Sequence, residues 1–376
     1  MAYSVSDISK ASALGVIFIV TVLGNALVAY VLIKNYKRLL KNRPTYQFIL
    51  NIVLSDLLVG LLTIPFEFTR ELLGNWVFER ELCKIVEYIE ISVSGTAVYT
   101  HALIAYDRYR SLARPYLPKL DGKRVKKMIA MAWLVPAVVT APYLYMFEVQ
   151  MIPSMAKTIC SPRAIPISWL DKLYEAVEFL VVLLLPFIVL CKCYFQVTLI
   201  MWGRSPMVAT DSFPATSRSI IHKTKKRVTR TSGLVAATFT VCWLPTFVLS
   251  FVRIVSGTES VHRGHVLYEI SMFGTFINEP ITPVIYCAFD KSLRARIAAR
   301  AICTYLTESS GSSVHIDQTI NTVTQNTAAD TNRKRVKFRN LDFNTELNHE
   351  RCSEGLKNLN EETRLQSCST PNEKIN

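Results

Sequence analysis

Charged side chains are scarce along this chain, and that scarcity argues against an ordinary soluble protein. Asp, Glu, Lys and Arg make up only 19% of the 376 residues, whereas half of the residues are apolar. Soluble domains carry charge on about a quarter of their residues. Because the length alone would allow two or three soluble domains, the distribution of the apolar residues must decide the class.

The sequence also lacks the spacings that indicate catalysis. It contains no nucleophile–base pair and no metal-ligand spacing, so we expect no catalytic residue, no enzyme activity and no cofactor. His101 is the only histidine inside an apolar stretch, where a packed polar residue is the commoner interpretation. No basic stripe lies on a soluble domain, which argues against nucleic acid as a partner.

Seven long apolar stretches dominate the chain. A bilayer-spanning helix needs about 20 largely apolar residues, and each stretch roughly meets that length. Buried helices of a soluble protein could give one or two such runs, but not seven. The sequence therefore predicts an all-α membrane protein, a bundle of seven transmembrane helices. The stretches are Ala11–Ile33, Gln47–Phe66, Ile85–Ile104, Met128–Met146, Tyr174–Ile200, Gly233–Ile254 and Val266–Phe289.

Basic residues are concentrated in the first, third and fifth connecting loops. Loops rich in Lys and Arg stay in the cytoplasm, so we expect the amino terminus outside the cell. The net charge of +14 then reflects this orientation and an attraction to anionic lipid of the inner leaflet. Examples from the three loops are Lys37, Arg38, Arg110, Lys123, Lys225 and Arg227.

The two ends of the chain differ from the bundle. Residues 1–10 form a short extracellular tail without an Asn-x-Ser/Thr acceptor, and no cleavable signal precedes the first helix. We assign residues 11–304 to the membrane bundle, including an amphipathic eighth helix at Lys291–Ala301 on the inner leaflet. Residues 305–376 are polar and predicted to be a disordered cytoplasmic tail, with phosphorylation sites or a purely solubilising role. Cys303 is a candidate for lipidation.

Short motifs occur at fixed places on the seven stretches. They are Asn25, Asp56, Asp107-Arg108-Tyr109, Trp133, Pro186, Tyr194, Phe239, Trp243, Pro245, Pro283 and Tyr286, in chain order. In this order, across Ala11–Ile302, the chain resembles the rhodopsin-like (class A) G-protein-coupled receptors, and in character most of all their neuropeptide receptors. The resemblance implies a plasma-membrane receptor that activates heterotrimeric G proteins, with arrestin and receptor kinases acting on its tail.

The resemblance assigns activation and G-protein coupling to the inner half of the bundle. It implies that Arg108 pairs with Asp107 at rest and, when active, with Tyr194 and a bound G protein. A basic residue reaching the membrane surface is the alternative. Trp243 and Pro245 resemble the family's aromatic toggle and helix kink, with core packing as the alternative. The other residues of this set are Tyr109, Phe239, Pro283 and Tyr286.

Two of the nine cysteines fall where oxidation is permitted, at the outer ends or loops. In the family, residues placed like Cys83 and Cys160 form the disulfide that pins the second extracellular loop to the third helix. Two free thiols are the alternative. Alternating apolar residues in Phe147–Ile159 predict a hairpin lid, which is usual in the family's peptide receptors.

Carboxylates are concentrated at the outer ends of the helices. Glu90 precedes Arg108 by 18 residues, about five helical turns, and therefore faces inward as Arg108 does. Negative charge in a low-dielectric cavity attracts a cation, which predicts a small basic peptide as ligand, with a small amine as the alternative. Some of these carboxylates could instead be rim charges in water. The predicted ligand-binding residues are Glu90, Glu87, Glu67, Glu178, Glu175 and Glu269.

The chain departs from familiar members of the family. Monoamine receptors carry an aspartate where this chain has Glu90, which argues against an ordinary monoamine site. Phe276 stands where photoreceptors carry a retinal-linking lysine, and the seventh stretch contains no lysine. Thr282 replaces a usual asparagine, and Lys225 stands where many members have an acid opposing Arg108. Both changes could loosen the resting state.

Deeper in the bundle, a second carboxylate is predicted beside Asp56. Glu279 precedes Tyr286 by seven residues, nearly two turns, and so shares its inward face at the depth of Asp56. Two close carboxylates in a low-dielectric site cannot both ionise without a cation, so either a proton is shared or a sodium ion binds. Asn25 and Asn278 complete this internal polar site. Alternatively, neighbouring prolines rotate Glu279 towards another helix.

Interior carboxylates have a rival explanation from a different class of protein. In a membrane transporter they would be ion ligands rather than parts of a receptor. Transporter folds are often built from internal repeats and broken helices, and neither is visible in this sequence. We therefore favour the receptor.

Overall fold

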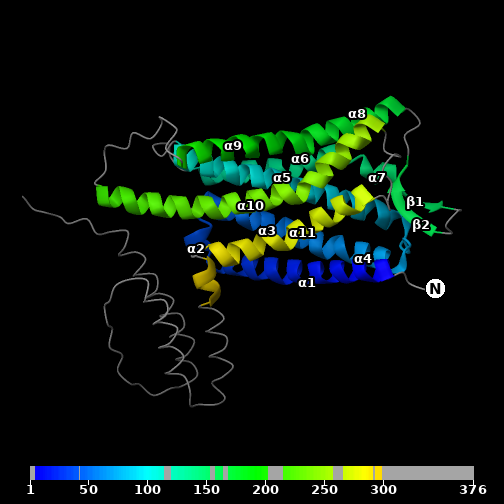
Figure 1. The fold of residues 1–376 in the computed structure, drawn as a ribbon, viewed down its shortest axis with the longest axis horizontal. Helices are drawn as coiled ribbons and strands as arrows, with labels where there is room; N and C mark the ends of the chain where they lie inside the picture. The colour runs from blue at the N-terminus through cyan, green and yellow to red at the C-terminus, as the bar shows by residue number, and fades with distance from the viewer. Residues whose placement is uncertain are drawn as a thin grey trace, which may run out of the picture. The chain divides into compact units, whose positions relative to one another are not determined.

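The computed structural model describes residues 5–41, 43–113, 120–152, 157–163, 168–201, 215–256, 266–290 and 293–298. The described chain is mainly helical, and its long helices lie alongside one another (Figure 1). The helices are α1 Val5–Lys34, α2 Tyr36–Leu39, α3 Pro44–Leu62, α4 Ile64–Leu73, α5 Arg80–Ala113, α6 Gly122–Thr140, α7 Tyr143–Met146, α8 Ser168–Glu178, the π-helix Phe179–Leu184, α9 Leu185–Met201, α10 Ala215–Ser256 and α11 Val266–Phe289. The strands are β1 Phe147–Ile152 and β2 Lys157–Pro162.

Each of the seven predicted stretches lies in one helix or in consecutive helices. The seventh stretch and α11 have the same bounds, Val266–Phe289. The second stretch is divided at Thr63, where α3 ends and α4 begins. Pro65, near the start of α4, lacks the N–H that would continue the α3 hydrogen-bond ladder. The break follows from that missing donor.

Five segments of the described chain are long and apolar enough to cross a membrane by length and composition. They are Asp7–Lys34, Pro44–Leu73, Gly122–Met146, Trp169–Ile200 and Thr231–Ser256. The outward faces of these helices carry large apolar side chains, such as Val138 and Val241, which are 62% and 71% exposed. Such a surface suits hydrocarbon rather than water. Helices α5 and α11 fall outside this group, and both carry buried carboxyl groups.

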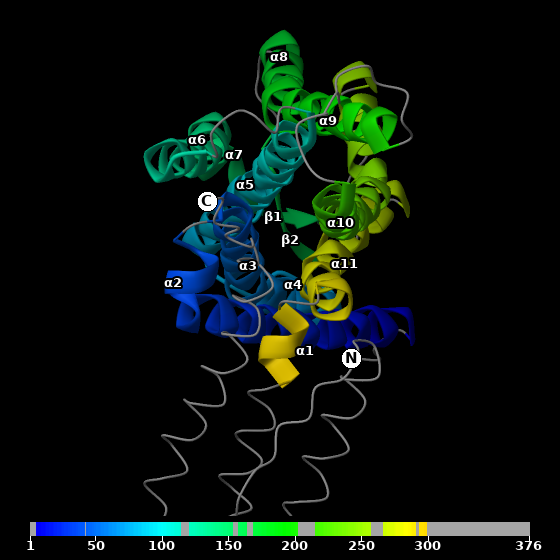
Figure 2. The ribbon, with the colours of Figure 1, turned by 90° about the vertical axis from the view of Figure 1, so that its left-hand side faces the viewer.

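Helix α5 occupies the middle of the bundle. It packs against α3, α6 and α9, and α10 packs along α11 (Figure 2). The α10–α11 contact is close at Gly274, where an added Cβ would lie 2.5 Å from the backbone oxygen of Cys242. A glycine is therefore required there for the two backbones to meet.

A π-helix interrupts the segment between α8 and α9. Its residues Phe179–Leu184 are followed by Leu185, whose N–H bonds to the carbonyl of Leu180, five residues earlier. Pro186 cannot donate a hydrogen bond to Val182, and the wider turn accommodates that loss. This element was not expected from the sequence.

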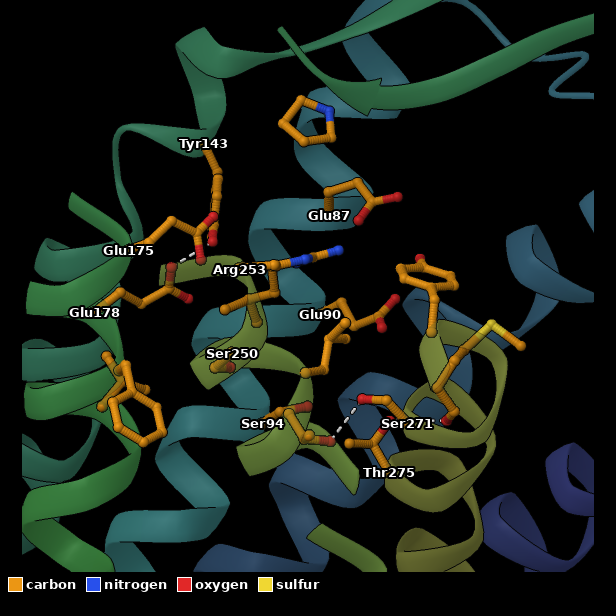
Figure 3. A pocket seen from close by; sticks show the side chains of 18 of the residues that line it. Glu87, Glu90, Ser94, Tyr143, Glu175, Glu178, Ser250, Arg253, Ser271 and Thr275 are labelled. Atoms are coloured by element: carbon orange, nitrogen blue, oxygen red, sulfur yellow. Dashed lines mark hydrogen bonds between the residues drawn. The ribbon is translucent and has the colours of Figure 1, made fainter. Parts of the chain in front are cut away.

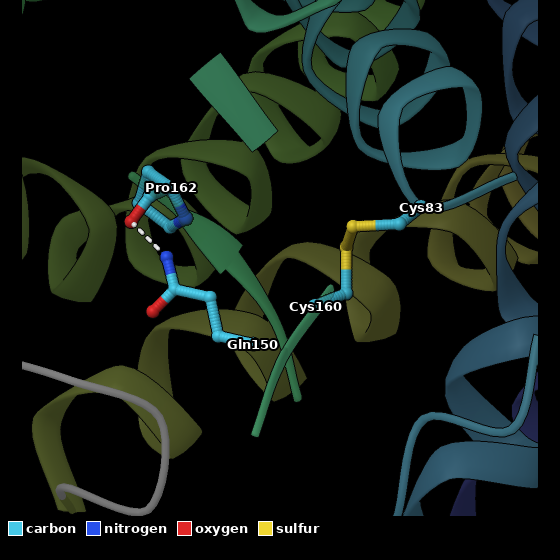
Figure 4. The surroundings of a disulfide bond; sticks show 4 residues. All are labelled: Cys83, Gln150, Cys160 and Pro162. Atoms are coloured by element: carbon cyan, nitrogen blue, oxygen red, sulfur yellow. Dashed lines mark hydrogen bonds between the residues drawn. A yellow bond between two sulfur atoms is a disulfide. The ribbon is translucent and has the colours of Figure 1, made fainter. Parts of the chain in front are cut away.

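The predicted hairpin is confirmed at one end of the bundle. Strands β1 and β2 pair antiparallel, with Val149 opposite Cys160. The Cys83–Cys160 disulfide joins β2 to the first turn of α5, as expected (Figure 4). Gln150 donates a side-chain hydrogen bond to the carbonyl of Pro162 across the hairpin, at 3.5 Å.

The bundle is a compact unit that ends at Leu293. The carboxyl group of Asp290 accepts the backbone N–H of Leu293 at 3.1 Å. Of the predicted eighth helix, residues 293–298 are described and are helical. Cys303 and the predicted tail, 305–376, lie outside the described residues, so the domain boundaries stay a prediction.

Candidate functional site

A cavity of about 430 Å³ opens at the end of the bundle that carries the hairpin (Figure 3). Its walls come from α5, α7, β1, β2, α8, the π-helix, α10 and α11. Ligand pockets of folded proteins commonly measure about 300–1,000 Å³, so the volume suits a small ligand or the end of a peptide. Four of the predicted acidic residues line it: Glu87, Glu90, Glu175 and Glu178.

Glu87 and Glu90 enter the cavity from α5. Three residues apart on a helix, they project from the same face, one turn from each other. The Glu87 side chain is buried, whereas Glu90 is partly open to the cavity. Glu90 makes no hydrogen bond or ion pair with any residue that the structure describes. Its carboxyl group is therefore available to a partner in the cavity.

Glu175 and Glu178 face the cavity from α8, on its opposite side. Glu178 accepts a hydrogen bond from the hydroxyl of Tyr143, which follows the end of α6. The Tyr143 ring also makes an edge contact with Tyr174, at 5.7 Å between ring centres. These aromatic contacts hold the second pair of carboxylates in place.

Arg253 is a cavity residue that the sequence analysis missed. It lies on α10, between the Glu175–Glu178 side and the Glu87–Glu90 side (Figure 3). Its guanidinium carbon is 5.8 Å from the centre of the Tyr268 ring, within cation–π range. Arg253 follows Thr246, another cavity residue, by seven positions or about two turns, and this helical phase could have revealed it.

Glu67 and Glu269, also predicted to bind the ligand, do not line this cavity. Glu67 is buried and pairs with Arg70, which also lies 3.0 Å from Glu71. Glu269 pairs with Lys10 of α1 at 2.6 Å. Their places near the outer ends of the helices made them candidates but did not reveal these basic partners, which pair with both charges within the protein.

Aromatic rings lie beneath the cavity. Trp243 lines its floor, and the Trp243 ring centre is 5.5 Å from that of Phe239. Phe239 in turn lies 4.5 Å from the ring of His101, which is buried in α5. Pro245 lies inside α10, two residues after Trp243. The floor of the cavity is thus in direct contact with the core of the bundle.

The predicted internal polar site is fully buried. Asp56 and Glu279 are 0% and 1% exposed and lie near each other. Both Asp56 oxygens and Oε2 of Glu279 lack hydrogen-bond partners among the described residues. Asn25 donates to the backbone oxygens of Thr21 and Glu279 rather than to Asp56. The Nδ2 atom of Asn278 is likewise buried and without a hydrogen bond to the described residues.

At the other end of the bundle, Arg108 pairs with Asp107 at 2.6 Å, and Thr45 donates to the same carboxylate oxygen. The Tyr194 hydroxyl donates to the backbone oxygen of Ser232 at 2.8 Å instead of contacting Arg108. Tyr109, also predicted here, packs with Tyr194 against the cluster that contains Phe239 and Trp243. Pro283 and Tyr286 are buried in α11.

The helices, the disulfide-anchored hairpin and the cavity together define a seven-helix receptor. The family described as "7 transmembrane receptor (rhodopsin family)" matches residues 24–286, and the chain belongs to this family. It is accordingly a receptor rather than an enzyme, and a multi-pass protein of the plasma membrane.

Similar proteins include neuropeptide receptors. The substance-K receptors of Mesocricetus auratus and Homo sapiens are each 27% identical over 304 residues, which cover 77% of this chain and 74% and 72% of theirs. The substance-K receptor of Canis lupus familiaris is 26% identical over 317 residues, covering 82% of this chain and 79% of its own. The expected resemblance to the neuropeptide receptors of the rhodopsin family is confirmed.

Proposed function

We propose that this receptor binds a basic extracellular peptide in the acidic cavity and, when occupied, activates heterotrimeric G proteins. The amino terminus and the hairpin then face outside, in agreement with the basic loops at the opposite end. Relatives named as substance-K receptors support a peptide rather than a small amine.

Glu90 carries the proposal. It is a carboxylate on the wall of a cavity of ligand size, with no hydrogen bond or ion pair to any described residue. Leaving a buried polar group without a partner costs about 1–3 kcal/mol, and more when the group is charged, so a cationic group of a ligand would be strongly favoured there. Glu87, Glu175 and Glu178 add to the negative potential.

The inner end of the bundle supports the coupling role. The pair between Asp107 and Arg108 is the contact that the family resemblance assigns to the resting receptor. The Tyr194 hydroxyl lies at the same end of the bundle and donates a hydrogen bond to the backbone oxygen of Ser232. In the active receptor it would give up this bond and pair with Arg108. Ligand binding at the outer end favours the state that binds the G protein only if the ligand has a higher affinity for that state than for the resting state.

Several partners and sites belong to the same proposal. Receptor kinases and arrestin act at the tail, Cys303 takes a lipid, and inner-leaflet lipid contacts the basic loops. Sodium would bind between Asp56 and Glu279, where both Asp56 oxygens and Oε2 of Glu279 are buried without a hydrogen-bond partner among the described residues. No cluster of three or more His, Cys, Asp or Glu side chains occurs in the described ranges, so such an ion would be coordinated by two carboxylates and by neutral oxygens.

A panel of synthetic peptides and amines tests the proposal. Cells expressing the receptor are exposed to basic peptides, matched neutral and acidic peptides, substance K and simple amines, with a second messenger as the readout. We expect responses to basic peptides and none to their acidic counterparts. Responses confined to amines would favour the small-amine alternative, and responses independent of ligand charge would contradict the acidic site.

A further inference from the structure

The acidic cavity has two separate negative sides. Glu87 and Glu90 belong to α5, whereas Glu175 and Glu178 belong to α8, and Arg253 of α10 lies between them (Figure 3). We propose that Glu175 and Glu178 form a second cation-binding subsite, so that the ligand carries two basic groups, one on each side of Arg253. This inference rests on the proposed function and specifies the ligand class.

Glu175 is a buried carboxylate on the cavity wall. Its side chain is only 8% exposed, it lines the cavity, and it makes no hydrogen bond or ion pair with the described residues. A carboxylate buried to this degree is normally paired. The unmet partner must come from the cavity, because the neighbouring Tyr143 hydroxyl bonds to Glu178 instead.

The walls around these two carboxylates suit a cation. Tyr143 and Phe179 line the cavity beside them, and aromatic faces attract guanidinium and ammonium groups. Tyr143 is fixed by its edge contacts with Phe147 and Tyr174, at 5.0 and 5.7 Å between ring centres. The subsite is therefore preformed on rigid rings.

Arg253 forms no ion pair with either carboxylate of the second subsite in the part of the chain that the structure describes. Its charge acts on Glu87, Glu175 and Glu178, yet within the described ranges no carboxylate oxygen lies within 4.0 Å of its guanidinium group. Its buried Nε atom also lacks a hydrogen-bond partner there. A guanidinium group has five N–H donors and no acceptor. Backbone carbonyl groups between the two basic residues of a peptide would meet these donors.

Two blocked tripeptides test the inference on the purified full chain in detergent. Acetyl-Arg-Gly-Arg-amide carries two guanidinium groups, and acetyl-Gly-Gly-Arg-amide carries one. Their apparent affinities are measured from the rise of the thermal unfolding midpoint with peptide concentration. In the wild type we expect the two-cation peptide to bind at least about tenfold more tightly, because one molecule engages both subsites.

The variants separate the two subsites. Glu178→Gln keeps an acceptor for Tyr143 and should remove the advantage of the two-cation peptide, while the one-cation peptide changes less than about threefold. Glu90→Gln should weaken both peptides. Glu81→Gln, an exposed carboxylate at the start of α5, is the matched control and should change neither.

The outcomes distinguish this inference from the proposed function. If Glu178→Gln leaves the affinity ratio of the two peptides unchanged while Glu90→Gln weakens both, the second subsite is wrong and the cation site at Glu90 stands. If neither peptide binds the wild type, or Glu90→Gln changes the affinity of neither, both the subsite and the proposed recognition by Glu90 are wrong.

Discussion

At the scale of single residues, the buried ion pair of Glu67 and Arg70 should contribute to the stability of the bundle. Both side chains are at most 8% exposed. Removing one member of a buried pair typically costs about 3–5 kcal/mol, because the other charge stays buried. We expect Arg70→Met to lower the thermal unfolding midpoint markedly, and Glu67→Gln combined with Arg70→Met to recover most of the loss.

The matched control is Lys84→Met, which removes the exposed pair with Glu81. Surface ion pairs contribute about 0–1 kcal/mol to stability, so the thermal unfolding midpoint of Lys84→Met should barely differ from that of the wild type. If Arg70→Met unfolds at the same temperature as the wild type, the pair has no role in stability.

Asp56 and Glu279 give the second prediction at this scale. If a sodium ion binds between them, replacing sodium chloride with choline chloride should lower the unfolding midpoint of the wild type, because an ion bound only by the folded state stabilises it. On the shared-proton alternative, agonist affinity should instead vary with pH between about 5 and 8.

Glu279→Ala should abolish whichever dependence the wild type shows. Glu269→Ala is the control, since that carboxylate lies on the same helix but is paired with Lys10. Wild-type unfolding curves and binding isotherms that superimpose across sodium and pH would eliminate both versions of the site.

At the scale of elements, hydropathy predicted where helices cross the bilayer but not where they end. Helix α10 begins at Ala215, although its apolar stretch begins at Gly233. Most of the intervening residues are basic or polar, which ends the hydropathy signal without ending the helix, because Lys and Arg are good helix formers. The bounds of α11 were predicted correctly because polar and charged residues flank its apolar stretch in the sequence.

Local pattern and tertiary packing account for the other successes and failures. The hairpin was predicted because its apolar residues alternate, and the family resemblance indicated the disulfide. The π-helix was missed, since a proline predicts disturbed hydrogen bonds but not how the turn absorbs them. The pairing of Glu67 with Arg70 and the position of Arg253 depend on which helices become neighbours.

The inner end of α10 carries the element-scale prediction. Residue 225 lies on this helix, and the family resemblance places it opposite Arg108. Lys225 would repel Arg108 where many family members have an attracting acid, so basal signalling of the wild type should be appreciable. Lys225→Glu should lower ligand-free second-messenger production at matched surface expression.

Lys226→Glu controls for the change of charge, because the next residue on a helix points about 100° away. Its basal signalling should stay near that of the wild type. Equal basal signalling in the wild type and Lys225→Glu would show that this position does not set the resting state.

At the scale of the whole molecule, the predicted tail should regulate the receptor rather than fold it. The compact unit ends at Leu293, before the polar residues begin. Each phosphate on the tail would add about 1.5–2 negative charges, a signal that arrestin could bind. Truncation after Leu306 should therefore preserve ligand binding while slowing desensitisation and internalisation. Lost binding, or unchanged internalisation, would contradict a regulatory tail.

The whole receptor links a carboxylate in the outer cavity to the Asp107–Arg108 pair at the inner end. The floor residue Trp243 contacts Phe239, and Phe239 contacts His101 of α5, the helix that carries both Glu90 and Arg108. On the proposed function, a ligand held at Glu90 would therefore act on α5 and, through the floor, on α10. The central claim is that Glu90 supplies the main counter-charge for this ligand.

The most direct measurement is the agonist concentration response of Glu90→Gln beside the wild type and Glu81→Gln, at equal surface expression. Losing one partner of a buried ion pair costs about 3–5 kcal/mol, so Glu90→Gln should raise the effective agonist concentration at least a hundredfold. Glu81→Gln should leave it unchanged. A shift of less than about threefold for Glu90→Gln, which corresponds to less than about 0.7 kcal/mol, would contradict the account.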